Sequence, residues 1–345
     1  MPRVTLITPC YNEEEVIEEF YTRVCRVADG NRPYEFEFLF VNDGSTDATG
    51  ALLDGWAAQD PRVKVVHLAR NRGHQIALTA GMDFASGDII VMLDADLQDP
   101  PETVPTLIER IDEGYDIVHT QRLSRKGETR FKRATARLFY LILGRFSKEP
   151  LIENSGDFRA FTRRVLLVAR TFREPHRYLR GLFPGFGFRQ AVVSYHRDER
   201  KAGKTAYSLA RMVALALDGV LSASTALLKG VLWIACILWL ISLAFLLRAC
   251  IGHFILHRTV PGWTSLVVLL TFFTGLNLFS LSVIGMYVSR IFEQGQHRPL
   301  YWCRRVENID TTALTANAEI PVEVGLSARL VAMGQDASRA APPQH

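Results

Sequence analysis

Two aspartates that follow an apolar run have the spacing to hold one divalent cation. Residues 89–93 read Ile-Ile-Val-Met-Leu, an unbroken run typical of a strand buried on both faces. Asp94 and Asp96 follow and, being two residues apart, point the same way in extended backbone. Carboxylates so placed bind hard cations such as Mg²⁺, although an acidic turn that is merely solvated has the same pattern.

Three other predicted strands end in polar stretches whose residue types suit a nucleotide. The stretches are Thr-Pro-Cys-Tyr-Asn-Glu at 8–13, Asn-Asp-Gly-Ser-Thr-Asp at 42–47 and Arg-Asn-Arg-Gly-His-Gln at 70–75. Asp43 could accept a hydrogen bond from a base or ribose, Tyr11 could stack on a base, and Arg70 could neutralise phosphate. A structural explanation is also open, because Asn12 and the polar residues at 42–46 fit as helix caps.

The elements that must position these stretches alternate strand and helix. Strands are predicted at 4–8, 37–41, 63–67, 88–93 and 117–120, and helices at 13–28, 46–58, 75–85 and 102–112. This rhythm predicts an α/β fold with a mainly parallel sheet covered by helices, in which ligands bind beyond the carboxyl ends of the strands. The chain contains neither G-x-G-x-x-G nor G-x-x-x-x-G-K-S/T, so neither a dinucleotide fold nor a P-loop is indicated.

Taken in order, the motifs TPCYNEEE, VNDGSTD, NRGHQIALTAG and LDADLQDPPE resemble the GT-A domain of family-2 inverting glycosyltransferases. The resemblance covers roughly the first two thirds of the chain and implies a Rossmann-like GT-A fold with a nucleotide-sugar donor. By matching position it places Pro9, Tyr11, Asn12, Glu13, Asp43, Arg70, Asp94 and Ala95 on the donor nucleotide. It assigns Mg²⁺ or Mn²⁺ to Asp94, Asp96 and Gln98, with Asp96 as a catalytic residue. A divalent ion there would stabilise the diphosphate leaving group.

A basic cluster follows the predicted metal motif. It comprises Gln-Arg-Leu-Ser-Arg-Lys-Gly at 121–127 and Arg-Phe-Lys-Arg at 130–133, and an apolar stretch at 138–143 continues it. One interpretation is a solvated basic helix face. The other is an interface helix near 129–147, with Arg122 and Arg133 binding an anionic lipid headgroup and Lys132 supporting them.

Two further predictions come from the resemblance. Asp157 matches a family carboxylate that lies near the acceptor, either as a catalytic base or as an orienting group. A lipid monophosphate is already anionic at neutral pH, so a strong base is not required. Residues 199–207 resemble a loop of polyprenyl-phosphate glycosyltransferases that closes over the donor diphosphate, and Arg200 matches its arginine. Ala206 stands where the family has lysine, and Lys204 matches only with a shift.

Two long uncharged stretches predict membrane-spanning helices. Residues 230–247 and 260–289 contain no charged side chain, and each is near or above the ~20 residues that cross a hydrocarbon core. Helices are expected near 228–250 and 262–290, with an amphipathic helix near 208–225 before them. Buried helices of a soluble core are the alternative. Lysines and arginines flank the pair, so the positive-inside rule predicts a multi-pass inner (plasma) membrane protein with its catalytic domain and tail in the cytoplasm.

The 345 residues are therefore expected to form three parts. These are a cytoplasmic GT-A domain at 1–207, a membrane domain at 208–305 and a flexible tail at 306–345.

Residues 284–301 resemble the Gly-x-Tyr-x-x-Arg-Ile-x-x-Glu … Arg-Pro-x-Tyr ending of undecaprenyl-phosphate glycosyltransferases. The five cysteines match neither a disulfide framework nor a zinc site, and His67 and His196 lack metal-ligand spacing. A net charge of +4 does not call for a nucleic-acid partner.

The resemblance, narrowed to the polyprenyl-phosphate (undecaprenyl- or dolichyl-phosphate) and bactoprenol glucosyltransferase-like subfamily, implies a membrane enzyme. It would transfer a hexose, best matched by glucose from UDP-glucose, to a polyprenyl phosphate by metal-dependent inverting displacement. Self-association is consistent with so small a membrane footprint. One alternative is a processive polysaccharide synthase, but its Gln-x-x-Arg-Trp motif is absent. Another is a non-catalytic lipid-binding scaffold, which would have no need of the retained carboxylates.

Overall fold

The computed structural model describes most of the predicted catalytic domain and one long apolar helix. The described residues are 1–123 except 32, 155–196 except 176 and 178, positions 237, 238, 240 and 244, 262–296, and 298–309. The chain forms two compact units. The first comprises Met1–Gly144, Glu149–Tyr207 and Pro299–His345, and the second Arg145–Lys148 and Ser208–Arg298.

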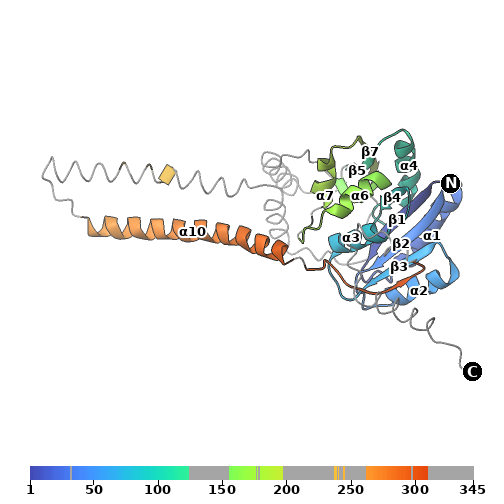
Figure 1. Cartoon of the computed structure of the whole chain (residues 1–345), viewed down its shortest axis with the longest axis horizontal. Helices are drawn as coiled ribbons and strands as arrows, with labels where there is room; N and C mark the ends of the chain where they lie inside the picture. Colours follow the sequence, from blue (N-terminus) through green and yellow to red (C-terminus); the bar gives the residue numbers. More distant parts are fainter. Residues whose placement is uncertain are drawn as a thin grey trace, which may run out of the picture. The chain divides into compact units, whose positions relative to one another are not determined.

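A single sheet forms the centre of the first unit, with eight strands among the described residues (Figure 1). They are β1 (Arg3–Cys10), β2 (Glu35–Asn42), β3 (Val63–Leu68), β4 (Ile89–Met92), β5 (Ile117–Leu123), β6 (Ser155–Thr162), β7 (Gln190–His196) and β8 (Cys303–Glu307). Their order is β7-β5-β6-β4-β1-β2-β3-β8. The pairs within β4-β1-β2-β3 and the pair β5-β7 are parallel, whereas β6 runs antiparallel to β4 and β5, and β8 to β3. The predicted mainly parallel α/β sheet is confirmed.

Helices cover both faces of this sheet, which explains the unbroken apolar runs of its central strands. One face packs against α1 (Ile17–Gly30), α2 (Thr49–Gln59) and α4 (Val104–Asp112), which directly follows η1 (Pro101–Thr103). The other packs against α3 (His74–Phe84), α6 (Arg163–Thr171), α7 (Leu179–Leu182) and η2 (Phe183–Phe186). Successive strand residues alternate between the two cores: Leu6 of β1 belongs to the first and Ile7 to the second.

The chain boundary predicted between residues 305 and 306 falls inside a strand. Strand β8 pairs with β3 from Val65↔Glu307 to Leu68↔Cys303, so its residues extend the sheet of the catalytic domain. The predicted membrane domain at 208–305 therefore ends too late, and the predicted tail at 306–345 begins too early. Short, charged strands such as Cys-Arg-Arg-Val-Glu carry no apolar alternation, which is why the sequence does not reveal this one.

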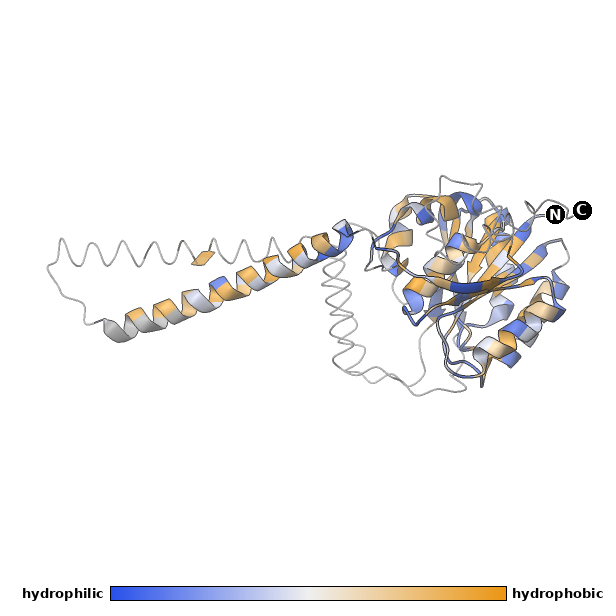
Figure 2. Cartoon of the chain, turned by 60° about the horizontal axis from the view of Figure 1, so that its bottom comes forward, coloured by the Kyte–Doolittle hydropathy of each residue, from blue (hydrophilic) through white to orange (hydrophobic). Residues whose placement is uncertain are grey.

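The second unit contains α10 (Trp263–Gly295), which coincides with the second predicted span. Within the described part of the chain it is the one helix long and apolar enough to cross a membrane, by length and composition, over Phe272–Gly295. Figure 2 shows the apolar residues along this helix and the polar ones gathered at its carboxyl end. The first predicted span and the predicted helices near 129–147 and 208–225 lie outside the described residues, apart from four isolated positions.

Candidate active site at the carboxyl ends of the central strands

The turns after β2 and β3 are joined by one buried carboxylate. Asp43 is 2% exposed, and its Oδ1 and Oδ2 accept hydrogen bonds from the backbone N–H groups of Arg72 (2.7 Å) and Gly73 (2.8 Å). Burial raises the pKa of Asp43, and these two hydrogen bonds oppose the shift. We call residues 42–46 and 70–73 the two donor turns, because both contain residues predicted to bind a donor nucleotide.

The turn after β1 is tied to the first donor turn by an asparagine in left-handed conformation. Asn12 has φ 55°, its Oδ1 accepts a hydrogen bond from the Thr46 N–H (2.8 Å), and its own N–H donates to Ser45 Oγ (3.1 Å). Helices α1 and α2 begin after Val16 and Ala48, without side-chain caps. Helix capping, left open from the sequence, is therefore not the role of these polar residues. Tyr11 beside them is 46% exposed, which leaves its ring accessible for stacking.

Gly44 lets the two donor turns approach each other, and its replacement by alanine is expected to separate them. Gly44 has φ +69°, and a Cβ there would lie 2.6 Å from the backbone nitrogen of Asn71. We expect Gly44→Ala to destabilise the protein by about 1–3 kcal/mol, from the strained φ and the clash, as measured by thermal unfolding. Gly55→Ala is the control: its Cβ meets nothing within 4 Å on helix α2, so it should be neutral or stabilising. Equal stability of the two variants would contradict the prediction.

Asp94 and Asp96, the two aspartates of the acidic motif after β4, lie in different environments. Asp94 Oδ1 is buried without a hydrogen bond among the described residues, whereas Asp96 Oδ1 accepts one from the Gln98 N–H (3.1 Å). Burial, together with the charges on Asp157, Asp99 and Asp96, raises the pKa of Asp94 to about 6, although His74 opposes the shift. The turn is tight, because Leu97, between Asp96 and Gln98, adopts φ 58°.

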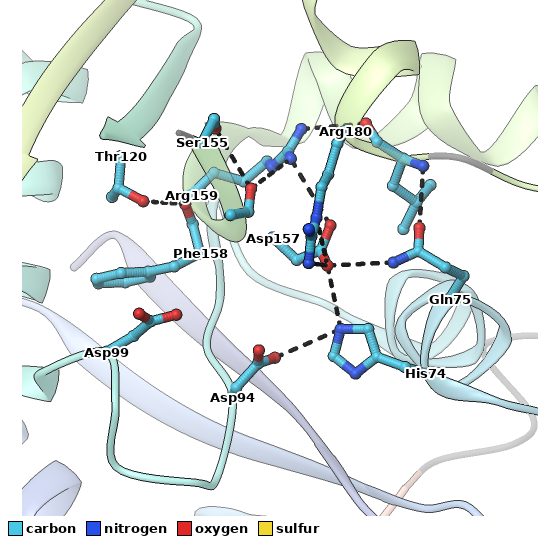
Figure 3. A network of polar contacts seen from close by, with 12 residues as sticks. His74, Gln75, Asp94, Asp99, Thr120, Ser155, Asp157, Phe158, Arg159 and Arg180 are labelled. Atoms are coloured by element: carbon cyan, nitrogen blue, oxygen red, sulfur yellow. Dashed lines mark hydrogen bonds and ion pairs between the residues drawn. The ribbon is translucent and has the colours of Figure 1, made fainter. Parts of the chain in front are cut away.

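A histidine at the start of α3 connects this acidic motif to Asp157 (Figure 3). His74 Nε2 lies 3.5 Å from Asp94 Oδ1 and 3.3 Å from Asp157 Oδ2. Burial lowers the pKa of His74, but the charge on Asp94 and the hydrogen bond and charge of Asp157 outweigh it and raise that pKa to about 9. The protonated imidazole therefore holds the two carboxylates together at neutral pH.

Asp157 itself is enclosed by donors. Its side chain is 1% exposed, and Oδ2 accepts hydrogen bonds from Arg180 Nη2 (2.8 Å) and Gln75 Nε2 (3.2 Å). Arg159 Nη2 lies 3.9 Å from Oδ1. Burial alone would raise the pKa of Asp157, but the hydrogen bond from His74 and the charge on Arg180 hold it well below its usual range. Asp157 is thus a permanent anion at neutral pH in this structure.

Arg122 is oriented at the same edge of the sheet by Asp99 and Tyr195. Its Nη2 donates to Asp99 Oδ2 (3.2 Å) and its Nε to the Tyr195 hydroxyl (3.1 Å), which in turn donates to Asp99 Oδ1. Asp99 is fully buried, and the Arg122 side chain is 18% exposed. Gly156 leaves room for the guanidinium, since a Cβ there would lie 2.6 Å from Arg122 Nη2.

Comparison with known proteins identifies the family. The model of glycosyl transferase family 2 matches residues 5–168. The relative "Uncharacterized glycosyltransferase YkcC" of Bacillus subtilis (strain 168) is 40% identical over 310 residues, which are 90% of this chain and 96% of that protein. The chain belongs to glycosyltransferase family 2.

Further relatives of this glycosyltransferase carry a more specific name. The "Bactoprenol glucosyl transferase" of Shigella phage SfV is 38% identical over 301 residues, which are 87% of this chain and 97% of that protein. Among solved structures, S. aureus TarS 1-349 in complex with UDP-GlcNAc is 20% identical and aligns with a TM-score of 0.44, covering 64% of this chain and 67% of that chain.

The candidate site brings together most of the residues predicted from the sequence. Pro9, Tyr11, Asn12, Glu13, Asp43, Arg70, Asp94, Ala95, Asp96, Gln98, Arg122 and Asp157 all lie at or next to the ends of β1–β6 on one edge of the sheet. Lys132, Arg133 and Arg200 lie outside the described residues.

Several residues of the candidate site were not predicted, among them His74, Gln75, Arg180 and Tyr195. The first two belong to the Gly-His-Gln part of a recognised motif, so their chemistry was visible although their partners were not. Arg180 and Tyr195 contact residues 23 and 96 positions away, respectively, and no local pattern marks them.

Proposed function

We propose that this glycosyltransferase transfers a hexose from a nucleotide sugar to a polyprenyl phosphate. The supporting observation is the likeness, over nearly their whole length, to relatives named bactoprenol glucosyl transferase, joined with a site in which one histidine contacts both the acidic motif and Asp157. Glucose from UDP-glucose is the first candidate donor. The proposal includes an inner-membrane enzyme whose catalytic domain faces the cytoplasm.

A divalent cation, Mg²⁺ or Mn²⁺, would be held by Asp94, Asp96 and Gln98. The buried Asp94 Oδ1 suits such a ligand, because it accepts no hydrogen bond among the described residues and lies 3.5 Å from His74 Nε2, its ion-pair partner. Among the described residues no three His, Cys, Asp or Glu side chains gather as a protein-only metal site. Two carboxylates and an amide leave coordination positions for diphosphate oxygens, as these ions prefer. When bound, the ion would supply Lewis-acid stabilisation of the leaving diphosphate.

In the proposed step, an oxygen of the lipid phosphate attacks the anomeric carbon as the bond from that carbon to the donor diphosphate breaks. The configuration inverts, and the nucleoside diphosphate leaves with the bonding electron pair. Tyr11 and the two donor turns hold the nucleoside, and Arg122 binds the acceptor phosphate in the orientation that Asp99 and Tyr195 impose.

Asp157 is proposed to act as a fixed anion and not as a base. A lipid phosphate carries no proton that must be removed before attack. The carboxylate instead keeps His74 protonated and Arg180 in place, so that two cations face the region where the acceptor and diphosphate charges meet.

A donor screen on membranes that contain the full chain tests the proposal. Radiolabelled UDP-glucose, GDP-mannose and UDP-N-acetylglucosamine are each supplied with undecaprenyl phosphate. We expect one donor to transfer label to the organic-soluble fraction, with UDP-glucose best. Chelation by EDTA should remove this transfer and Mn²⁺ restore it. Label that stays in the aqueous phase with every donor would refute the proposal, as would transfer that does not depend on the lipid phosphate.

A further inference from the structure

The residues that follow α10 run along the outer edge of β3, towards the second donor turn. We call residues 301–309, which include β8, the C-terminal strap. Beyond the last strand pair, Leu68↔Cys303, the Ala69 N–H donates to the Trp302 carbonyl (2.8 Å). Because β3 continues directly into residues 70–73, this pairing brings Trp302 beside that donor turn.

Trp302 contacts the two arginines of the second donor turn. Its ring centroid lies 4.7 Å from Arg72 Cζ and 5.9 Å from Arg70 Cζ. Two guanidinium groups this close repel each other, and the negative face of an indole offsets that repulsion. Asp43 accepts hydrogen bonds from the backbone of the same turn. The carboxylate of Asp43 therefore fixes the main chain of the turn, and the ring of Trp302 fixes its arginine side chains.

A second chain of contacts leads from the strap to the first donor turn. Arg305 Nη2 pairs with Asp54 Oδ2, and Asp54 Oδ1 lies 3.0 Å from His67 Nε2. Asn42 Nδ2 donates to His67 Nδ1 (3.0 Å), so the ring proton is on Nε2 and points to Asp54. Asn42 Oδ1 accepts a hydrogen bond from the Ser45 N–H (2.9 Å). His67, which lacks metal-ligand spacing in the sequence, is the buried middle of this series of contacts.

The strap is anchored independently of both donor turns. The Tyr301 hydroxyl donates to the buried Asp83 Oδ2 (2.7 Å), which also pairs with Arg173. At the other end Asn308 Nδ2 donates to the carbonyls of Ala57 (2.6 Å) and Val63 (2.9 Å). A change confined to the Trp302 ring therefore leaves the strap attached.

We propose that Trp302 and Arg305 are positioning residues for the nucleotide-sugar donor, acting through Arg70, Arg72 and Asn42. The inference rests on the proposed function, because it takes the two donor turns as the donor site. It makes the donor site depend both on turns near the start of the chain and on residues after α10, a helix that residues 296–302 separate from β8. The substrate class affected is the nucleoside diphosphate part of the donor, not the lipid.

The test compares Trp302→Ala, Trp302→Phe and Arg305→Ala in the full chain, purified in detergent. Titration calorimetry with UDP and Mn²⁺, and separately with GDP and CDP, gives the dissociation constant. The transfer assay gives KM for the donor and kcat. We expect Trp302→Ala to raise both the dissociation constant and the donor KM about five-fold with kcat within about two-fold, and Arg305→Ala to raise them about two-fold. Trp302→Phe keeps an aromatic ring, so its dissociation constant and donor KM should lie close to those of the wild type.

Arg304→Ala is the matched control, since Arg304 is an exposed strap arginine that contacts neither donor turn in the described structure, and it should behave as wild type. Wild-type constants in Trp302→Ala would overturn the inference while leaving the proposed function intact. A fall in kcat and melting temperature with an unchanged KM would also overturn it, because that pattern indicates a structural role. A wild-type protein that binds none of the three nucleotides would overturn the proposed function and the inference together.

Discussion

Asp96→Ala is expected to lower sugar transfer by about a thousand-fold while the protein stays folded. Asp96 is a proposed ligand of the divalent ion, and its loss removes stabilisation of the leaving diphosphate. In the structure its side chain is partly exposed and accepts one backbone hydrogen bond, from Gln98, so the cost in folding stability should be about 1 kcal/mol. Initial rates of lipid-linked sugar formation across a Mn²⁺ titration provide the measurement.

A second aspartate provides the control for Asp96→Ala. Asp116 is also partly buried and accepts one side-chain hydrogen bond from a backbone N–H, that of Arg189 (3.4 Å). It precedes β5 and so lies at the opposite edge of the sheet from the proposed site. Asp116→Ala should therefore retain transfer. An Asp96→Ala protein with full activity would eliminate the proposed metal role of this residue.

The largest expected effect on stability comes from Asp157→Ala. This change removes the anion that the fully buried Arg159 and the side chain of Arg180 face, and it leaves His74 with Asp94 alone of its two carboxylates. Removing one partner from a buried ion pair costs about 3–5 kcal/mol, so we expect a large fall in the melting temperature of the purified protein as well as a loss of transfer.

The comparison for Asp157→Ala is an aspartate whose ion pair lies in solvent. Asp29 is 70% exposed and pairs with Arg62, 39% exposed, so Asp29→Ala should cost less than about 1 kcal/mol. If Asp157→Ala were inactive yet as stable as Asp29→Ala, the fixed-anion role would be wrong and a catalytic base would be the better assignment.

The strands that carry the donor turns were predictable, because each combines an apolar run with a polar end. Strands β1–β5 and the four long helices between them match the sequence expectations closely. The apolar pattern of the strands indicates that both faces of the sheet are buried, and Gly44 indicates that two turns approach each other closely. These signals are local, so they can be interpreted from the sequence without knowing which residues the side chains contact.

The contacts that assemble the site could not be predicted in the same way. Strand β6 contains Asp157 and Arg159, charged residues that local patterning does not place in a buried strand. The burial of Asp157 is explained by Arg180, Gln75 and His74, which reach it from other elements. Arg159 donates hydrogen bonds to the carbonyls of Gly156 and Leu179. Strand β8 could not be predicted either, because its Arg305 pairs with Asp54 of α2, a residue 251 positions earlier in the sequence.

Strand β6 enters the sheet in the reverse direction between β4 and β5, so Asp157 lies near the start of a strand and not in a loop after one. Strand pairing on both sides fixes the register of β6: Met92 of β4 is paired with Arg159, and Gln121 of β5 is paired with Ser155. The connection over residues 124–154 can therefore lengthen, shorten or change composition without displacing this carboxylate. The position of Asp157 is thus determined by the pairing of three strands, and it does not depend on which residues join β5 to β6.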